Sequence, residues 1–279
     1  TIRVSLTEAP EFEMPVARTL LDHFKKFQTH RKISKIKDYP LNPFEYEKRK
    51  TNTILNIGGK NYPIIKADFS LKKKITPASL FALGYNYSVP LDKWHISDMA
   101  ADYVLVGDHN INFEVPGTLG VIYNYNTWKT HKKGYPFLTV KQYINNQIKS
   151  KKINFIYAVL SDLTAQLKNL LKSDKTAVLL IDTNNLNGIA EQRKLFIELI
   201  NNHIKTPVII RRSYEDITIE ELQLSASSDI GSLLLDGLGD GILIYSENCG
   251  SDQMKNNLSF GILQATRTRI SKTEYISCP

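Results

Sequence analysis

From about residue 152 to residue 269, the chain alternates between apolar runs of strand length and patterns typical of helices. The runs 178–181 and 208–210 are rich in Val, Leu and Ile without polar alternation, as in parallel strands that are covered on both faces. In the segment 188–204 apolar residues recur at intervals of three and four, which indicates an amphipathic helix. Four successive strand–helix units of this kind predict a parallel sheet.

Further elements are expected along the rest of the chain. The predicted strands are 2–6, 53–57, 63–69, 80–85, 103–106, 119–123, 155–160, 178–181, 208–211 and 242–245, and the predicted helices are 13–27, 139–149, 161–172, 188–204, 218–234 and 251–269. Strands from residue 50 onward suffice for an α/β fold of the closed (β/α)8 TIM-like barrel type. Because the N-terminal half is less regular, an open doubly wound sheet remains the alternative.

Proline and glycine residues mark the expected boundaries between segments of the chain. Residues 29–49 are basic and carry Pro40 and Pro43, which indicates a linker between an N-terminal unit, 1–28, and a barrel domain, 50–269. Gly58 and Gly59 separate two β-type runs and predict a hairpin over 53–69 at one end of the barrel. The last residues, 270–279, would open a further domain.

Composition limits the class of protein. The net charge is +8, but the lysines fall into short separate clusters, without zinc-finger spacing or a basic helix, so we expect solvated lysines and no nucleic-acid partner. No run of about 18 apolar residues occurs, so no membrane-spanning helix is expected. The start shows no pattern of a signal peptide, and two cysteines make no disulfide framework, so we expect a cytoplasmic location.

Three motifs carry a family resemblance. They read R-V-S-L-T-E at residues 3–8, L-D-G-L-G-D-G-I at 235–242 and K-T-E-Y-I-S-C-P at 272–279. Together they resemble the large, insert-bearing form of the hydroxymethylbutenyl diphosphate synthase family, iron–sulfur enzymes of the methylerythritol phosphate route to isoprenoids. The matching motifs lie at both ends of the chain. Between them, the chain matches the family only in the order of its predicted strands and helices. Usage rich in Lys, Asn and Ile is typical of a bacterial member.

The resemblance implies the architecture of a longer protein. In that family an N-terminal barrel holds the cyclic diphosphate substrate, a C-terminal domain holds a [4Fe-4S] cluster, and the large form carries an extra barrel between them. This chain would then begin in the last strand of the first barrel, run through the inserted barrel and stop at the first cluster cysteine. The family continues S-C-P, residues 277–279 here, with S-C-G-R-T, and this sequence stops before that continuation.

The resemblance also implies roles for three residues. Arg3 and Ser5 match the family's contacts to the substrate diphosphate, and residues two apart on a strand share one face. Cys278 matches the family's first cluster cysteine. Clusters of this kind are held by cysteine thiolates. Cys249 matches nothing and is interpreted as a free thiol in a loop.

Other residues receive plainer interpretations. The six histidines show no H-x-x-x-H or H-E-x-x-H spacing, so no metal site is inferred from them. Asp236, Gly237, Gly239 and Asp240 are expected to form a tight turn that leads into the last strand.

The two ends of the chain share one predicted order of elements, namely a strand, a loop and a helix. When Thr1 is aligned with Gly241, Arg3 corresponds to Leu243 and Ser5 to Tyr245. If the inserted barrel is a copy of the catalytic one, its diphosphate contact has been lost, so we expect a scaffold without catalytic residues of its own.

An alternative is a stand-alone barrel that binds an anionic or phosphorylated ligand at the carboxyl ends of its strands. Arg211 and Arg212 would hold the anion, and the other polar residues expected at these ends are Asp182, Asn184, Asn185 and Glu247.

The resemblance implies an oxidoreductase that converts 2-C-methyl-D-erythritol 2,4-cyclodiphosphate to 4-hydroxy-3-methylbut-2-enyl diphosphate. Ferredoxin or flavodoxin would supply the electrons, and the neighbouring catalytic and cluster domains would be partners of the inserted barrel. The barrel would be a spacer between them, and this chain alone is expected to be inactive.

Overall fold

The structure is a computed structural model that describes residue 4, residues 9–146 and residues 148–273. Most of the strand predicted at 2–6 lies outside the described residues, as do Arg3, Ser5 and Cys278. The described residues comprise an N-terminal helix, the linker segment and the barrel.

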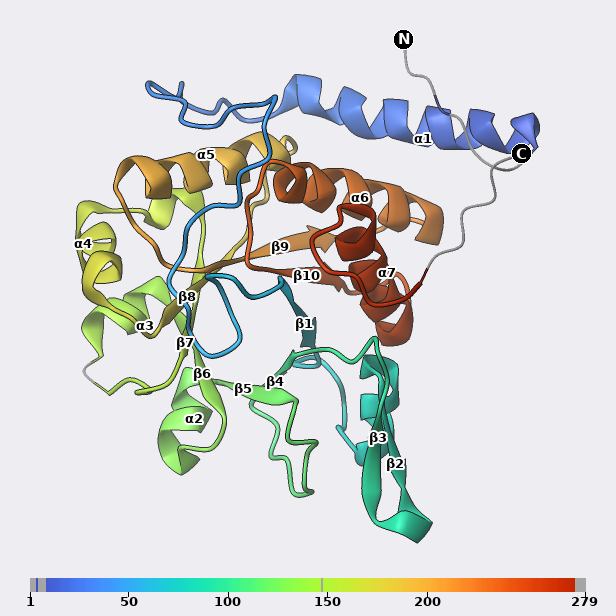
Figure 1. The fold of residues 1–279 in the computed structure, drawn as a ribbon, viewed down its shortest axis with the longest axis vertical. Helices are drawn as coiled ribbons and strands as arrows, with labels where there is room; N and C mark the ends of the chain where they lie inside the picture. The colour runs from blue at the N-terminus through green and yellow to red at the C-terminus, as the bar shows by residue number, and fades with distance from the viewer. Residues whose placement is uncertain (1–3, 5–8, 147, 274–279) are drawn as a thin grey trace.

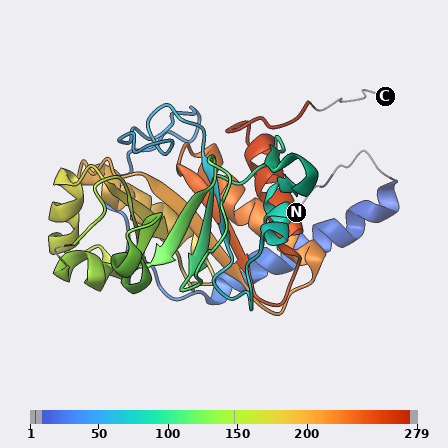
Figure 2. The same ribbon diagram turned by 90° about the horizontal axis from the view of Figure 1, so that it is seen from below.

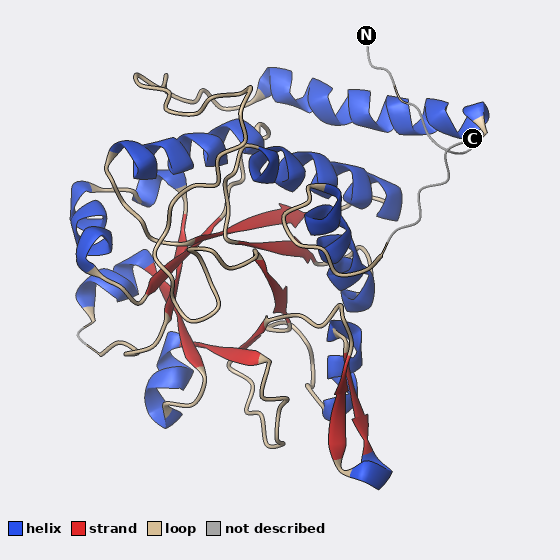
Figure 3. Ribbon diagram, viewed as in Figure 1, coloured by secondary structure: helices blue, strands red, loops and turns tan. Residues whose placement is uncertain are grey.

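Eight parallel strands form a closed barrel, which confirms the predicted fold class and excludes the open sheet (Figures 1 and 3). The strands are β1 (Ile64–Asp68), β4 (Tyr103–Gly107), β5 (Gly120–Asn124), β6 (Tyr135–Thr139), β7 (Asn154–Ala158), β8 (Ala177–Ile181), β9 (Val208–Tyr214) and β10 (Gly241–Ser246). The ring closes because β1 pairs with both its neighbours, Ile64 lying opposite Gly241 and Lys66 opposite Tyr103.

Helices surround most of this ring. They are α2 (Tyr125–His131), α3 (Val140–Asn145), α4 (Ala165–Ser173), α5 (Gly188–Asn201), α6 (Ile219–Leu235) and α7 (Asp252–Ala265). Thr164, Asn187, Thr218 and Ser251 each accept a backbone N–H bond at the start of a helix, which fixes where α4 to α7 begin. The predicted alternation of strand and helix from residue 152 onward is confirmed.

The N-terminal half departs from the prediction between β1 and β4. The expected strand 80–85 is wrong, because a 3-10 helix occupies Pro77–Leu83, capped by Thr76 and ended by Gly84 at φ +86°. An antiparallel hairpin of β2 (Tyr85–Ser88) and β3 (Lys93–Ile96) follows and projects from the barrel (Figure 1). The 3-10 helix packs against α7, whereas the hairpin extends away from the ring.

The predicted hairpin over 53–69 is also wrong. Ile54 and Ile57 pair with each other across a tight turn instead of pairing with β1. Both isoleucines are buried in the cluster that fills the barrel interior, so the turn closes the amino end of the barrel. The attraction of two apolar side chains to that interior outweighs the hairpin signal of Gly58 and Gly59.

Two apolar layers hold the barrel together. Side chains that alternate inward along the strands fill the interior, and those that point outward pack beneath the helices. The inner cluster comprises Ile54, Ile57, Ile64, Tyr103, Leu105, Ile122, Ile153, Phe155, Val178, Leu180, Ile209 and Leu243.

The segment before the barrel is bound to its outer surface. Residues 30–49 contain no helix or strand and lie along α5, where Lys194 Nζ donates to the carbonyl of Ser34 at 2.7 Å. Arg49 donates to the carbonyls of Ile204 and Thr206 at 2.6 and 3.0 Å. Helix α1 (Glu13–Lys25) lies outside the ring along α6 (Figures 1 and 2).

Candidate functional site at the carboxyl end of the barrel

Polar side chains gather where the strands end, as the geometry of this fold requires. They surround a cavity of about 710 Å³ at the barrel mouth. Its lining includes Asp68 and Ser70 after β1, Asp108 and His109 after β4, Asn124, Phe137, Thr139, Tyr157, Arg211 and Tyr245.

Arg211 and Asp182 form the central ion pair of this mouth. Arg211 Nη1 donates to Asp182 Oδ2, and the guanidinium carbon lies 4.5 Å from the ring centroid of Tyr245. Asp182 also accepts bonds from Tyr157 Oη at 3.1 Å and from the N–H of Thr183 at 2.8 Å. The carboxylate of Asp182 therefore accepts several hydrogen bonds at once, and its negative charge neutralises that of Arg211.

The phenol of Tyr157 is a poor acid in this setting. Burial raises its pKa, the negative charge of Asp182 raises it further, and the result is about 12. Tyr157 therefore stays protonated at neutral pH and acts as a hydrogen-bond donor that orients Asp182.

Lys66 points into the barrel from the middle of β1. Its side chain is 1% exposed, and its Nζ has no hydrogen-bond partner among the described residues. The ammonium lies 5.2 Å from the ring centroid of Phe137. Burial lowers the pKa of Lys66 to about 8, although the carboxylate of Asp68 opposes the shift.

The remaining carboxylates of the mouth are held by local donors. Asp68 accepts from the N–H and the hydroxyl of Ser70 at 2.9 and 2.6 Å. Asp108 accepts from Asn124 Nδ2 at 2.7 Å and from Thr127 Oγ1. These bonds order the strand ends and leave the mouth without an excess of positive charge.

Arg212 does not join Arg211, since neighbouring residues of a strand point to opposite faces. It lies on the outer face of β9 and donates to the buried Asp229 of α6 at 2.7 Å. His23 and Tyr214 bond the same carboxylate at 2.9 and 3.0 Å. Burial alone would raise the pKa of Asp229, but the bonds from His23 and Arg212 outweigh it and lower that pKa. The arrangement in which both arginines hold one anion is therefore not formed.

Asn185 binds the segment before the barrel and does not line the cavity at the mouth. Its Nδ2 donates to the carbonyl of Arg31 at 3.0 Å and to Glu191 at 3.2 Å, and the Arg31 guanidinium reaches Glu191 at 3.2 Å. Asn184 is exposed beside this network and lines a separate cavity with Asp182.

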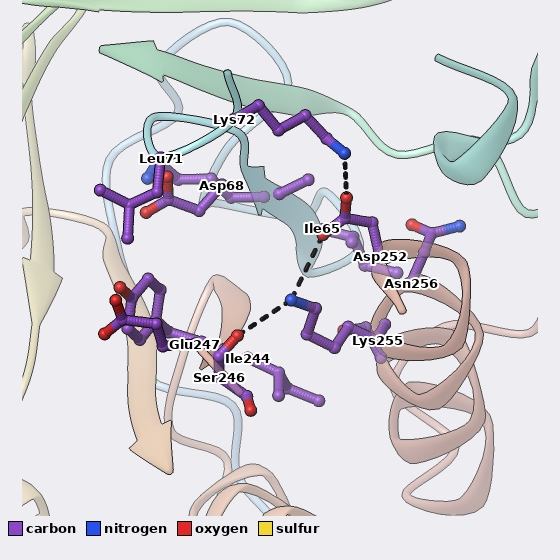
Figure 4. A pocket seen from close by; sticks show the side chains of 14 residues that line it. Ile65, Asp68, Leu71, Lys72, Ile244, Ser246, Glu247, Asp252, Lys255 and Asn256 are labelled. Carbon is purple, nitrogen blue, oxygen red and sulfur yellow. Dashed lines mark hydrogen bonds and ion pairs between the residues drawn. The ribbon is translucent and has the colours of Figure 1, made fainter. Parts of the chain in front are cut away.

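Glu247 lines a smaller cavity of about 270 Å³ between β1, β10 and α7 (Figure 4). Across that cavity Asp252 binds Lys72 at 2.6 Å and Lys255 at 3.2 Å. Lys255 also donates to the carbonyl of Ser246 at 3.1 Å. The cations facing Glu247 are thus already paired within the chain.

The turn expected at 236–240 is confirmed. Gly237 and Gly239 have φ values of +74° and +98°, which glycine adopts without strain. Asp240 is buried and accepts from Thr51 at 2.9 Å and from the N–H of Val208 at 3.0 Å. This motif anchors the amino end of the barrel, and its role is structural.

The described residues do not fit an iron–sulfur cluster. A [4Fe-4S] cluster is held mainly by cysteine thiolates, whereas Cys249, buried in the loop after β10, is the one thiol in the described part of the chain. Within those residues, no group of three or more His, Cys, Asp or Glu side chains could hold a metal ion. The predicted ligand Cys278 lies outside them, with Arg3 and Ser5.

Sequence reasoning missed Lys66. Its signal was the spacing of Lys66 and Asp68 within the run 63–69, which places two charges on the face of the strand that also carries Ile64. In a strand covered on both faces, such charges must lie inside the protein.

In fold, the molecule is a (β/α)8 barrel with a polar mouth whose charges are largely paired. No family model matches the chain. Among the described helices, none is long and apolar enough to cross a membrane.

Relatives cover the whole chain. A protein of Parabacteroides distasonis named 4-hydroxy-3-methylbut-2-en-1-yl diphosphate synthase (flavodoxin) is 34% identical over 100% of this chain and 42% of its own length. Proteins of the same name from Bacteroides fragilis and Leptospira interrogans are 32% and 26% identical, again over 100% of this chain, which covers 41% and 45% of their lengths. These synthases are homologues of the chain over its whole length, and the chain spans about two fifths of their own length.

Proposed function

We propose that this chain is the inserted barrel, with flanking ends, of a 4-hydroxy-3-methylbut-2-en-1-yl diphosphate synthase. The whole enzyme would reduce 2-C-methyl-D-erythritol 2,4-cyclodiphosphate by two electrons and two protons. The ring C–O bond breaks, one water leaves, and 4-hydroxy-3-methylbut-2-enyl diphosphate forms. Flavodoxin, named for the relatives, or ferredoxin would supply the electrons.

The observation that carries this proposal is similarity over the full chain to part of a longer synthase. The end motifs support it, since Arg3 and Ser5 match diphosphate contacts and Cys278 matches a cluster ligand. A bound cluster supplies one-electron transfer. The other cluster ligands would come from outside this chain, and the whole enzyme would act in the cytoplasm.

Within that enzyme the barrel, residues 50–269, would be a spacer without catalytic residues. The paired charges of the mouth support this role, because Arg211 is neutralised by Asp182 and Arg212 is committed to Asp229. A rigid body of this kind would set the distance between the substrate barrel and the cluster domain, and placement of reacting groups controls rate.

The first test is to sequence the reading frame on both sides of this chain. The proposal requires a barrel before Thr1 and, after Pro279, the sequence Ser-Cys-Gly followed by a later cysteine and a glutamate as cluster ligands. Thr1 and Pro279 close to the ends of the natural protein would contradict it.

The second test measures turnover. This chain with reduced flavodoxin and the cyclic diphosphate should yield no product, and the full-length enzyme should lose most of its activity on Arg3→Ala. The full-length Asp182→Asn variant tests the spacer role and should keep turnover within about twofold of wild type, since removal of a transition-state contact would cost tenfold or more. A larger loss, with folding intact by circular dichroism, would assign the mouth a part in the reaction.

A further inference from the structure

A second large cavity lies at the other end of the barrel from the mouth. It has a volume of about 970 Å³ and opens beside the first residues of β4, β5 and β6, namely Tyr103, Gly120 and Tyr135. The loop after β4, the end of α2 and the segment before β7 form its walls. Cavities of about 300–1,000 Å³ are the size that binds small molecules.

Five lysines line this cavity. Lys132 and Lys133 follow α2, whereas Lys149, Lys151 and Lys152 precede β7, so the fold brings together two clusters that are separate in the sequence. Among the described residues, none of the five forms an ion pair. Lys149 lies 4.0 Å from the ring centroid of Tyr143 and interacts electrostatically with Asp174, whereas the exposed Lys133, Lys151 and Lys152 are available to an anion.

Two carboxylates share the lining and do not cancel this charge. Asp102 is held by Arg269 at 2.5 Å, and Glu114 lies on the loop after β4. With Asp102 neutralised, the lining carries five cations against one free carboxylate.

Part of the lining is apolar and aromatic. Ile111, Phe113 and Val115 are partly buried there, and Trp128 is 4% exposed. The indole N–H of Trp128 is buried and has no hydrogen-bond partner among the described residues, and Lys132 Nζ lies 5.1 Å from its ring centroid. A buried donor without a partner is costly, and an acceptor on a ligand would relieve that cost.

We propose that this cavity binds a small organic molecule that carries a diphosphate and an apolar group. The lysines would pair with the phosphate oxygens, and the partly exposed Ile111, Phe113 and Val115 would cover the hydrocarbon. The product named for the relatives belongs to this chemical class, but the inference does not rest on the proposed reaction, because binding is measured without an electron donor.

A nucleic acid is the competing occupant of a lysine-rich surface. Single strands bind where aromatic rings are exposed for base stacking, whereas Trp128 is buried in the cavity wall. The hollow shape and the apolar wall favour a small amphipathic anion.

The test is calorimetric titration of the chain with geranyl diphosphate, with inorganic diphosphate and geraniol as probes of the two halves of the ligand. Geranyl diphosphate should bind saturably and at least about tenfold more tightly than either half, because the cationic and the apolar parts of the lining both contribute. In a Trp94→Phe background, Trp128 is the remaining tryptophan, and its fluorescence should change on binding.

A charge reversal distinguishes this cavity from general basicity. The Lys133→Glu/Lys151→Glu variant should weaken binding by about tenfold or more, since charge-assisted contacts are lost. The matched control, Lys73→Glu/Lys74→Glu, changes the charge equally at an exposed cluster outside the cavity and should bind as wild type does. Absent binding, equal loss in the control, or tighter binding of a single-stranded RNA oligomer would overturn the proposal.

Discussion

The two ends of the barrel hold their charged side chains in opposite ways. At the carboxyl end, Arg211 is paired with Asp182, and Asp68 and Asp108 accept bonds from their own loops. At the amino end, the lining of one cavity includes five lysines, none of which forms an ion pair among the described residues. The end where this fold usually carries its active site is therefore the electrostatically satisfied one.

Because of this difference, substitutions at the two ends are expected to affect different properties, namely stability at the carboxyl end and ligand binding at the amino end. Where a charge is buried and paired, removal of its partner leaves an uncompensated ion, so substitutions there are expected to change the free energy of unfolding. Where charges are exposed and unpaired, the same free energy should hardly change, and an effect should appear only when an anion is present.

The largest effect is expected at the buried pair behind the mouth. Asp229→Ala should lower the free energy of unfolding by about 3–5 kcal/mol, because Arg212 keeps its charge with no carboxylate beside it. Urea denaturation followed by circular dichroism measures this change.

A matched variant separates the lost pair from the lost charge. Asp229→Leu/Arg212→Met removes both ions and should lie closer to wild type than Asp229→Ala does, since an apolar pair can replace a buried ion pair. If the double variant is as unstable as Asp229→Ala, the cost does not come from the unpaired arginine.

The next effect should be a stabilisation. Lys66→Met removes an amine that is buried without a hydrogen-bond partner and whose pKa is lowered from 10.5 to about 8. With about 1.4 kcal/mol for each pKa unit, the variant should exceed wild type by up to about 3 kcal/mol at neutral pH.

The pH dependence of that stabilisation has a definite sign. Below the folded-state pKa of about 8, Lys66 is charged in both states and its burial cost is complete. As the pH rises from 8 towards 10.5, the folded protein loses this proton before the unfolded chain does, so wild type gains stability relative to the variant. A stability difference that stays constant over this range would contradict the buried position of the amine.

A smaller loss is expected inside the mouth. Asp182→Ala leaves Arg211 without its carboxylate, but that guanidinium is 17% exposed and keeps its contact with Tyr245. The expected decrease is about 1–3 kcal/mol, measured by thermal unfolding. A decrease as large as that of Asp229→Ala would remove the distinction between a partly solvated pair and a buried one.

The smallest effect is expected at the amino end. Lys133→Glu/Lys151→Glu should change the free energy of unfolding by less than about 0.5 kcal/mol, because both side chains are exposed and unpaired. Denaturation without added anions measures this. A loss above about 1 kcal/mol would mean that these lysines serve the fold as well as a ligand.

Much of the barrel could be predicted because its buried strands are continuous apolar runs. Strand β6 was missed because Pro136 interrupts its short apolar run, and proline is unusual within a strand. The 3-10 helix Pro77–Leu83 was mistaken for a strand because its apolar composition resembles one. Length and apolar content do not distinguish these forms in so short a segment.

The site was harder to predict than the fold, because partners distant in sequence decide its charges. Alternation along β9 already separates Arg211 from Arg212, and could have excluded a shared anion. That Asp182 and Asp229 neutralise them separately depends on the packing of β8 and α6. The convergence of two lysine clusters on one cavity likewise depends on tertiary structure alone.

The pairing of β1 with β10 has a consequence for synthesis of the chain on the ribosome. Ile64 meets Gly241 across the closure, so the first barrel strand keeps an unpaired edge while nearly all later strands are made. Contacts so distant in sequence slow folding, and an open strand edge invites association with other chains. The nascent barrel is therefore most exposed to misassembly just before β10 emerges, and a chaperone that shields β1 would act in that interval.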